Sequence, residues 1–224
     1  MRILYEDGEI VVCIKEAGVL SQPSAKGNEA DMTALLAAHF EENGEPATPF
    51  VVHRLDRATS GVMVYAKTER AAARLSLAAA GEGMKKTYLA VTEGVPREAE
   101  GELTDLLFFD RARDKSFVVD RARRGVKEAR LSYTLEKTVE QDGRVLSLLR
   151  VTLGTGRTHQ IRAQLASRRL PLYGDARYGA KTRGALGLFA CSLTFPHPKT
   201  GKELTFSAEP SGTPFDFFAT DIPF

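Results

Sequence analysis

One acid stands between two arginines in a nine-residue stretch that ends in Thr, Ser and Gly: His53-Arg54-Leu55-Asp56-Arg57-Ala58-Thr59-Ser60-Gly61. The apolar runs Phe50–Val52 before it and Gly61–Tyr65 after it each predict a short buried strand. Asp56 is therefore expected on a short connection between two strands, where a rigid scaffold presents the side chain. Nearby guanidinium groups favour an ionised carboxyl group, which suits a nucleophile or an electrostatic stabiliser better than a proton donor. A structural ion pair on a turn explains the pattern equally well.

Other segments extend the pattern along the chain. Ile3–Asp7 leads through an apolar run to Lys15-Glu16-Ala17-Gly18, and Lys86–Gly94 follows in the middle. Further on lie Gly156–Arg162 and Pro171–Gly179. In order and spacing, the set resembles the RluA-type pseudouridine synthases, which isomerise uridine to pseudouridine in structured RNA. The resemblance spans nearly the whole chain.

The chain departs from the family pattern in three ways. Glu16 stands where the family usually has proline, which alters only a loop. Residues 77–84 lack the Gln-Phe pair and the arginine that members often carry there. No small RNA-binding domain is expected before the catalytic part, so we expect one catalytic domain over residues 1–224.

The order of predicted elements indicates the fold class. Asp31 is expected to cap a helix over 32–42 with Met32, Leu35, Leu36 and Phe40 on one apolar face. A second helix over 69–80 follows Thr68, and a short third follows Thr158, with Ile161 and Leu165 facing the core. Strands are predicted at 2–5, 9–14, 61–67, 87–93, 116–119, 129–138, 145–153, 188–195 and 204–208. Because strands outnumber helices and follow one another directly, the class is α+β. The resemblance implies the pseudouridine synthase fold, a long, mixed, mostly antiparallel sheet with flanking helices and a central cleft.

Composition places the chain among soluble globular proteins, with 43% apolar and 27% charged residues. It has no apolar run of 18 residues, and its acidic start does not resemble a signal peptide. Cys13 and Cys191 lie in strand-like runs and are expected as buried thiols. We therefore expect a cytoplasmic protein, without membrane contact and monomeric by default.

Charge is unevenly distributed. Residues 1–46 hold 3 Lys or Arg against 9 Asp or Glu, whereas residues 110–130 hold 8 against 4 and residues 157–183 hold 7 against 1. Such polarity is typical of a polyanion-binding face. Together with the resemblance it indicates structured RNA as the partner, either ribosomal or transfer RNA, and no DNA.

The resemblance also implies roles for individual residues. Asp56 is the expected catalytic carboxylate, which attacks the sugar, takes a proton from it or stabilises its charge. Arg162, expected to point from the core into the cleft, is its candidate partner. Tyr88 is expected to stack on the uracil and to assist removal of the C5 proton. The expected substrate-binding residues are Arg54, which replaces the extruded base, Lys86, the phosphate-binding Arg157 and His159, and Leu165 in the base pocket. His53 is expected as a hydrogen-bonding residue at a strand end.

The isomerisation has no redox step, so no cofactor is expected, and the four histidines have no metal-ligand spacing. Two alternatives stay open. One is a catalytically silent RNA-binding protein on the same fold. The other is a hydrolase that uses Asp56 to cleave an N-glycosidic bond and releases free uracil.

Overall fold

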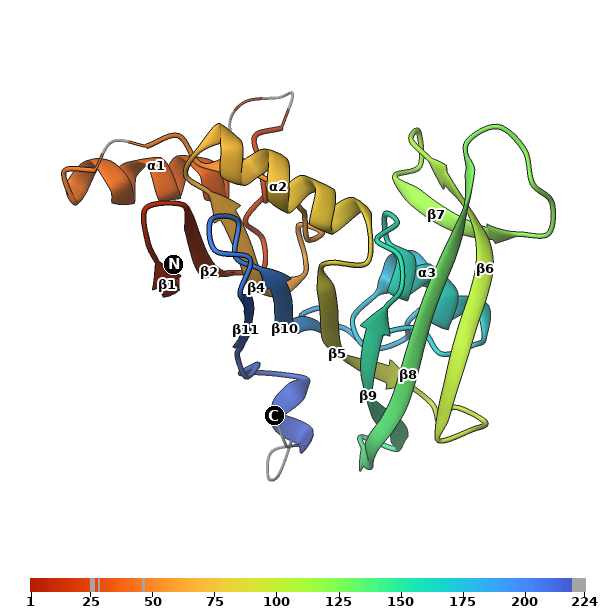
Figure 1. Cartoon of the computed structure of the whole chain (residues 1–224). Helices are drawn as coiled ribbons and strands as arrows, with labels where there is room; N and C mark the ends of the chain where they lie inside the picture. Colours follow the sequence, from red (N-terminus) through yellow and green to blue (C-terminus); the bar gives the residue numbers. More distant parts are fainter. Residues whose placement is uncertain (25–26, 28, 46, 219–224) are drawn as a thin grey trace. The chain divides into compact units, whose positions relative to one another are not determined.

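The computed structural model describes residues 1–24, 27, 29–45 and 47–218, and the chain forms two compact units (Figure 1). Unit 1 comprises Met1–Lys86 and Ala190–Glu209, and unit 2 comprises Thr87–Phe189 and Pro210–Phe224. The chain passes between the units three times: within strand β5 (Lys85–Glu93), within strand β10 (Leu188–Pro196), and between Glu209 and Pro210.

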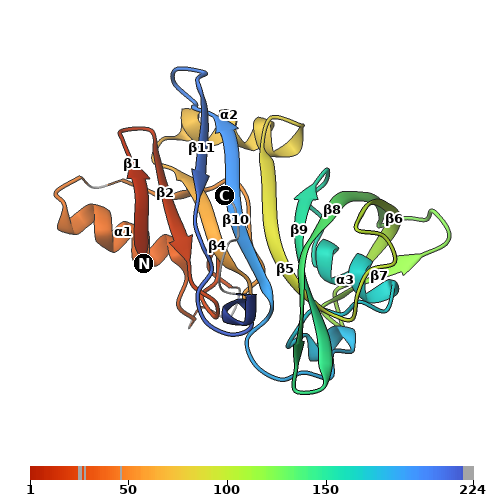
Figure 2. The ribbon, with the colours of Figure 1, turned by 90° about the horizontal axis from the view of Figure 1, so that it is seen from below.

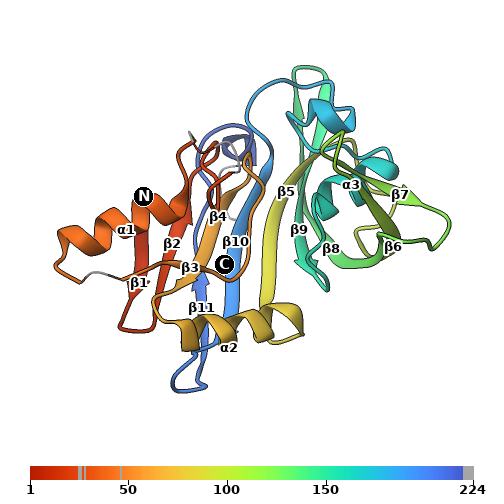
Figure 3. The ribbon, with the colours of Figure 1, turned by 90° about the horizontal axis from the view of Figure 1, so that it is seen from above.

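Unit 1 holds one part of the sheet, with two helices on one face of that part. Its strands run in the order β1-β2-β4-β10, with β3 beside β4 and β11 beside β10. Helices α1 and α2 lie on the same side of this sheet, in front of it from above and behind it from below (Figures 2 and 3). The bounds are β1 Arg2–Glu6, β2 Ile10–Lys15, α1 Met32–Glu42, β3 Phe50–Val51, β4 Ser60–Ala66, α2 Glu69–Ala80 and β11 Glu203–Ser207.

The centre of unit 1 consists of buried strands and capped helices. Every residue of β2 is buried, and β4 pairs with it antiparallel. The Asp31 side chain accepts hydrogen bonds from two backbone N–H groups at the start of α1, and Thr68 caps α2, both as predicted. Met32, Leu36 and Phe40 are buried, but Leu35 is 41% exposed, so its predicted place on the apolar face was wrong. Its position along the helix turns it away from the row that the other three form.

Unit 2 holds the remaining strands of the same sheet, in the order β5-β9-β8-β6-β7, and their β6–β7, β6–β8 and β8–β9 pairs are antiparallel. A 3₁₀ turn, η1, follows α3, and a second, η2, lies near the C-terminal end of the described chain. The bounds are β6 Glu100–Asp110, β7 Lys115–Val119, β8 Val126–Gln141, β9 Arg144–Leu153, α3 Gln160–Ser167, η1 Ala176–Tyr178 and η2 Phe215–Phe218.

Helix α3 packs against β6, β7 and η1. A buried apolar cluster forms at this contact, from Leu107 of β6, Ala129 of β8, Ala163 of α3 and Tyr178 of η1. Ile161 and Leu165 face the core as predicted, but six successive residues from Gln160 to Leu165 are buried. A helix buried around this much of its circumference must supply partners for its own polar side chains.

The predicted α+β class is confirmed. Both cysteines are buried thiols, as expected. Among the described residues, no helix is both long and apolar enough to cross a membrane.

Candidate active site

Asp56 lies in a tight turn that leads into β4. The Thr59 N–H donates a hydrogen bond of 3.0 Å to the Asp56 carbonyl oxygen, which closes a four-residue turn. Aspartate is a favoured first residue of such turns. The Asp56 side chain is partly exposed, and the buried Leu55 and Thr59 flank it at short distance along the chain. The turn therefore holds a carboxylate at the surface of unit 1 on a fixed backbone.

Two buried side chains fix the backbone that precedes the turn. Ser21 Oγ donates to the Leu55 carbonyl oxygen over 2.9 Å and accepts from the Leu55 N–H over 3.1 Å. His53 Nε2 accepts from the Val64 N–H of β4 over 3.1 Å, which confirms the predicted strand-end role. Burial, with a smaller contribution from the Lys86 charge, lowers the pKa of His53 to about 3. The imidazole is thus neutral, with its proton on Nδ1 because Nε2 accepts.

A fully buried lysine lies beneath the turn. Lys15 Nζ donates to the carbonyl oxygens of Glu16, Val19 and Arg57 at 3.0, 2.8 and 3.2 Å. Three carbonyl acceptors satisfy the three donors of an ammonium group. Burial lowers the pKa of Lys15 to about 8, while the charges of Asp56 and Glu16 oppose this shift. Lys15 was expected only as part of a motif; in the structure it is a buried cation beneath the Asp56 turn that interacts electrostatically with Asp56.

Gly61, the last residue of the stretch 53–61, occupies a position that excludes a side chain. Its φ is +132°, and a Cβ at this position would lie 2.3 Å from the Ala190 carbonyl oxygen in β10. Only glycine combines this backbone conformation with so close an approach between strands.

The two arginines beside Asp56 do not act alike. Arg54 is exposed. Arg57 donates from Nε to the Gly18 carbonyl oxygen over 3.0 Å and forms an ion pair with Glu29. The guanidinium of Arg57 is therefore bound to the segment that also holds Lys15, a pairing that sequence neighbourhood alone does not reveal.

In unit 2, Arg162 on α3 is buried and 8% exposed. Its Nε and one terminal nitrogen donate to the two carboxylate oxygens of Asp175 at 2.7 and 2.9 Å. The guanidinium carbon also lies 5.0 Å from the centre of the Tyr178 ring. The prediction that Arg162 points away from the core was wrong in this respect: its helix is buried on that side too. Its pairing with Asp56 joins residues of different units and stays a prediction.

Tyr178 is the centre of the cluster around Arg162. Its hydroxyl oxygen accepts from the Ser116 N–H over 2.8 Å and lies 3.2 Å from His159 Nδ1. Lys115 Nζ lies 4.8 Å from the ring centre. These contacts explain why Gly156–Arg162 and Pro171–Gly179 occur together: residues of the second segment hold those of the first. Sequence reasoning named both segments but not Asp175 or Tyr178 as partners.

The other predicted site residues have varied surroundings. Tyr88 of β5 is buried, and Lys86 at the start of the same strand is half-buried, which lowers its pKa. Arg157 is partly exposed, and its Nε donates to the Glu128 carbonyl oxygen over 2.8 Å. His159 is buried, so its predicted phosphate contact lacks the accessible surface it needs. Leu165 is fully buried, so its packing role is confirmed, while a contact with the base needs surface that this residue does not expose.

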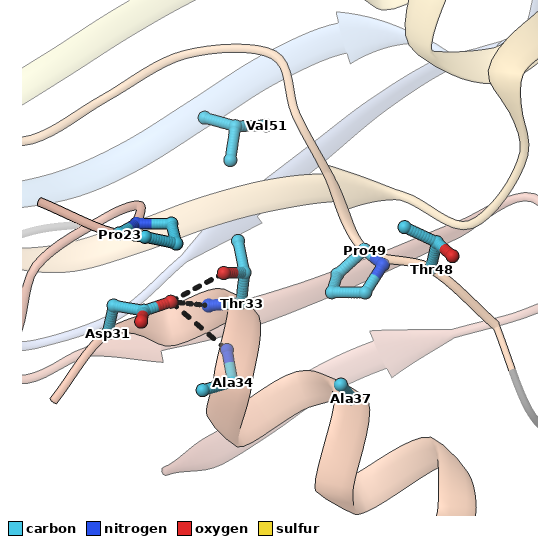
Figure 4. A pocket seen from close by; sticks show the side chains of 8 residues that line it. All are labelled: Pro23, Asp31, Thr33, Ala34, Ala37, Thr48, Pro49 and Val51. Atoms are coloured by element: carbon cyan, nitrogen blue, oxygen red, sulfur yellow. Dashed lines mark hydrogen bonds between the residues drawn. The ribbon is translucent and has the colours of Figure 1, made fainter. Parts of the chain in front are cut away.

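A hollow of about 440 Å³ lies in unit 1 beside the start of α1 (Figure 4). Asp31 faces it, but its carboxylate is already bound to the N–H groups of Thr33 and Ala34, as the dashed lines show. The rest of the lining is short or apolar: Pro23, Thr33, Ala34, Ala37, Thr48, Pro49 and Val51. Within the part of the chain that the structure describes, no group of three His, Cys, Asp or Glu side chains has the arrangement of a metal site.

Comparison with known proteins identifies the family. The profile described as RNA pseudouridylate synthase matches residues 9–167. An uncharacterized RNA pseudouridine synthase of Bacillus subtilis is 34% identical over 92% of this chain and 67% of its own length. The ribosomal large subunit pseudouridine synthase D of Vibrio cholerae is 34% identical over 93% of this chain and 67% of its own length. The chain thus spans about two thirds of these relatives.

Solved structures agree on the fold. Human RNA pseudouridylate synthase domain containing 1 matches with a TM-score of 0.77 at 19% identity, over 93% of this chain and 83% of that one. Human RNA pseudouridylate synthase domain containing 4 matches with a TM-score of 0.74 at 23% identity, over 93% of this chain and 88% of that one. The chain belongs to the RluA-type RNA pseudouridine synthases, a family of isomerases that act on RNA.

Proposed function

We propose that this protein converts specific uridines of ribosomal or transfer RNA to pseudouridine, with Asp56 as the catalytic carboxylate. The observation that supports this most strongly is the mounting of Asp56. Its turn is closed by its own backbone, and the neighbouring residues are bound by Ser21 and Lys15. A catalytic group acts best when surrounding hydrogen bonds fix its position in advance.

The reaction breaks the bond between ribose C1′ and base N1 and forms one between C1′ and C5. The C5 proton leaves and N1 gains a proton, so the product is an isomer of the substrate. An ionised Asp56 serves each route to this product: attack on C1′, removal of a sugar proton, or stabilisation of positive charge on the sugar. None of these routes requires a redox cofactor.

The remaining site residues take supporting roles in the proposal. Arg162 orients Asp56 from unit 2, and its bidentate bond to Asp175 gives the guanidinium a fixed plane. Tyr88 stacks on the uracil and assists removal of the C5 proton, and Lys86 binds the substrate beside it. Arg54 is exposed next to Asp56 and fills the space of the extruded base. His159 and Leu165 are both buried and contribute indirectly, because they hold α3 in place.

Phosphate groups of the RNA bind the basic segment of unit 2 between β6 and β8. Arg121, Arg123 and Arg124, in the connection from β7 to β8, and Lys127, at the start of β8, are all exposed. Arginine and lysine side chains bind phosphates irrespective of sequence and hold the RNA in register. Arg157 continues this surface, because it is anchored to the Glu128 carbonyl group of β8.

Large-subunit ribosomal RNA is the first target to test, since relatives named ribosomal large subunit pseudouridine synthase D match over 93% of this chain. Transfer RNA is the second. The protein acts as a monomer in the cytoplasm, where both RNAs are found.

The test uses ribosomal and transfer RNA transcripts labelled with tritium at uridine C5. Pseudouridine formation releases one tritium per modified site into water, and digestion of the RNA then shows the modified nucleoside. Tritium release with matching pseudouridine supports the proposal. Free uracil would indicate the hydrolase, and intact uridine with tight RNA binding would indicate the silent binding protein.

A further inference from the structure

We propose that unit 2 carries a docking groove for the phosphates of a double-stranded RNA stem, apart from the Asp56 turn. The groove has a volume of about 560 Å³. Its basic residues are Arg144 at the start of β9, Arg169 just after α3, and Lys181 beyond η1. The proposal rests on the proposed function for the identity of the partner as RNA.

Two basic side chains of the groove differ from neighbouring arginines that form ion pairs within unit 2. Arg168 forms two hydrogen bonds with Asp105 at 2.8 and 3.1 Å, and Arg177 forms an ion pair with Asp114. Among the residues that the structure describes, the side chains of Arg169 and Lys181 have no such carboxylate partner. Their charges are therefore available to an anion, whereas that of Arg168 is largely neutralised within the protein.

Glu93 is the acid among the lining residues, and its carboxylate is already occupied. It accepts from the Lys181 N–H over 2.8 Å and from the Thr182 N–H over 2.6 Å. Burial on its own would raise the pKa of Glu93. The bonds from Thr182 and Lys181 and the nearby charge of Arg144 outweigh burial and lower that pKa. Glu93 thus fixes the backbone that carries Lys181, and three cations against one bound carboxylate leave the groove positive.

The residues that line the groove also indicate whether it binds paired or unpaired RNA. Unpaired bases bind proteins chiefly by stacking on exposed aromatic rings. The aromatic residue of this groove is Tyr178, which is 9% exposed and packs against Arg162 and Lys115. The rest is charge, glycine and small apolar surface, namely Gly94, Gly143, Val145, Ala166, Pro171 and Gly179. Such a surface suits the phosphates of a duplex, which is recognised by shape and backbone.

The test measures binding of a fluorescein-labelled 20-base-pair RNA duplex by anisotropy across a range of KCl concentrations. The full chain carries Asp56→Asn so that no turnover occurs, and Arg169→Gln with Lys181→Gln removes two groove charges. We expect about tenfold weaker duplex binding at 100 mM KCl and a salt slope lower by roughly 2, since each phosphate contact contributes about 0.9. The control Lys137→Gln with Lys202→Gln removes two exposed charges outside the groove and should change binding less than twofold.

Equal losses in the groove variant and the control would mean that only net charge matters, which would overturn the groove. A loss of affinity for a 20-nucleotide oligouridine but not for the duplex would overturn the assignment to a stem.

With Asp56 restored, the groove variant should show a KM raised about tenfold and a kcat within twofold of wild type. If wild type forms no pseudouridine but the groove variant still loses duplex affinity, the proposed function fails and the groove stands. If wild type is active and the groove variant binds the duplex normally, the groove alone fails.

Discussion

Lys15 Nζ lies 3.2 Å from the carbonyl oxygen of Arg57, the residue that follows Asp56. The Gly18 N–H donates to the same oxygen over 2.8 Å, so two donors hold the turn, one at the end of β2 and one in the loop after it. Lys15 is completely buried, and the charge of Asp56 opposes the lowering of the Lys15 pKa by burial. The position of the turn that carries the proposed catalytic group therefore depends on one buried ammonium group.

Activity is expected to fall as pH rises through about 8, the pKa of Lys15. Loss of the proton leaves two N–H donors for three carbonyl acceptors and removes the positive charge near Asp56. The pH profile of kcat between pH 6 and 10 tests this. In Lys15→Arg the guanidinium stays charged, so activity relative to its own maximum should persist at pH 9. An unchanged alkaline limb in Lys15→Arg would assign the titration to another group.

The same residue predicts the pH dependence of stability. Its pKa is about 8 in the folded protein against 10.5 for an unperturbed lysine, so above pH 8 the unfolded chain binds a proton that the folded chain does not. The Lys15 contribution to the free energy of unfolding should therefore rise from pH 8 to 10.5, by about 3 kcal/mol in total. Urea unfolding of wild type and Lys15→Met at pH 7.5 and 9.5 measures it. A wild-type stability that changes no more than that of Lys15→Met would contradict the burial of a charged lysine.

Gly61→Ala should destabilise unit 1 by about 2–4 kcal/mol. The new methyl group would meet the Ala190 backbone at 2.3 Å, and the backbone conformation itself disfavours alanine. Thermal unfolding measures the loss. Gly8→Ala is the matched control, because nothing lies within 4 Å of its added Cβ and it should change stability by less than 1 kcal/mol. Equal unfolding temperatures of the two variants would show that β4 and β10 do not approach each other closely at Gly61.

Asp175→Asn should lower the free energy of unfolding by about 3–5 kcal/mol, because it leaves the buried Arg162 charge without its bidentate acceptor. Asp114→Asn removes a carboxylate from the more exposed Arg177 pair and should cost at most about 1 kcal/mol. Chemical denaturation of the two variants gives the comparison. Equal costs would mean that the Arg162 pair is not isolated from water.

The sequence predicted the strands and helices of unit 1 closely, because β2 and β4 are continuous apolar runs and both helices carry capping residues. It missed β6 entirely and shortened β8 to 129–138. Glu100, Glu102, Asp105 and Asp110 interrupt the apolar pattern of β6, which forms through pairing with β7 and β8 rather than through its own periodicity. Local patterns do not record such tertiary pairing.

The candidate site was predicted to a similar extent. Asp56, Arg162 and His53 were singled out from motifs, but Ser21, Asp175 and Tyr178 were not assigned roles. Their contacts join residues 34, 13 and 19 positions apart, to Leu55, Arg162 and His159 respectively. Contacts over such separations follow from the fold, and a single sequence gives no periodic signal for them.

Activity should survive prolonged dialysis against EDTA. The isomerisation is redox-neutral, and the proposed catalysis uses a carboxylate in place of a Lewis acid. The substrate must be a short stem-loop that stays folded in monovalent salt, so that RNA folding does not need magnesium. Loss of activity that zinc or magnesium restores, with the RNA fold unchanged, would require a metal in the mechanism.

Single-turnover formation of pseudouridine by wild type and Asp56→Asn tests the central claim most directly. The substitution preserves the shape of the side chain and removes its charge, so the variant should fold and bind RNA within about threefold of wild type. Its rate should fall by at least about a thousandfold, which corresponds to roughly 4 kcal/mol of transition-state stabilisation. A rate within tenfold of wild type would show that the Asp56 carboxylate does not carry the reaction.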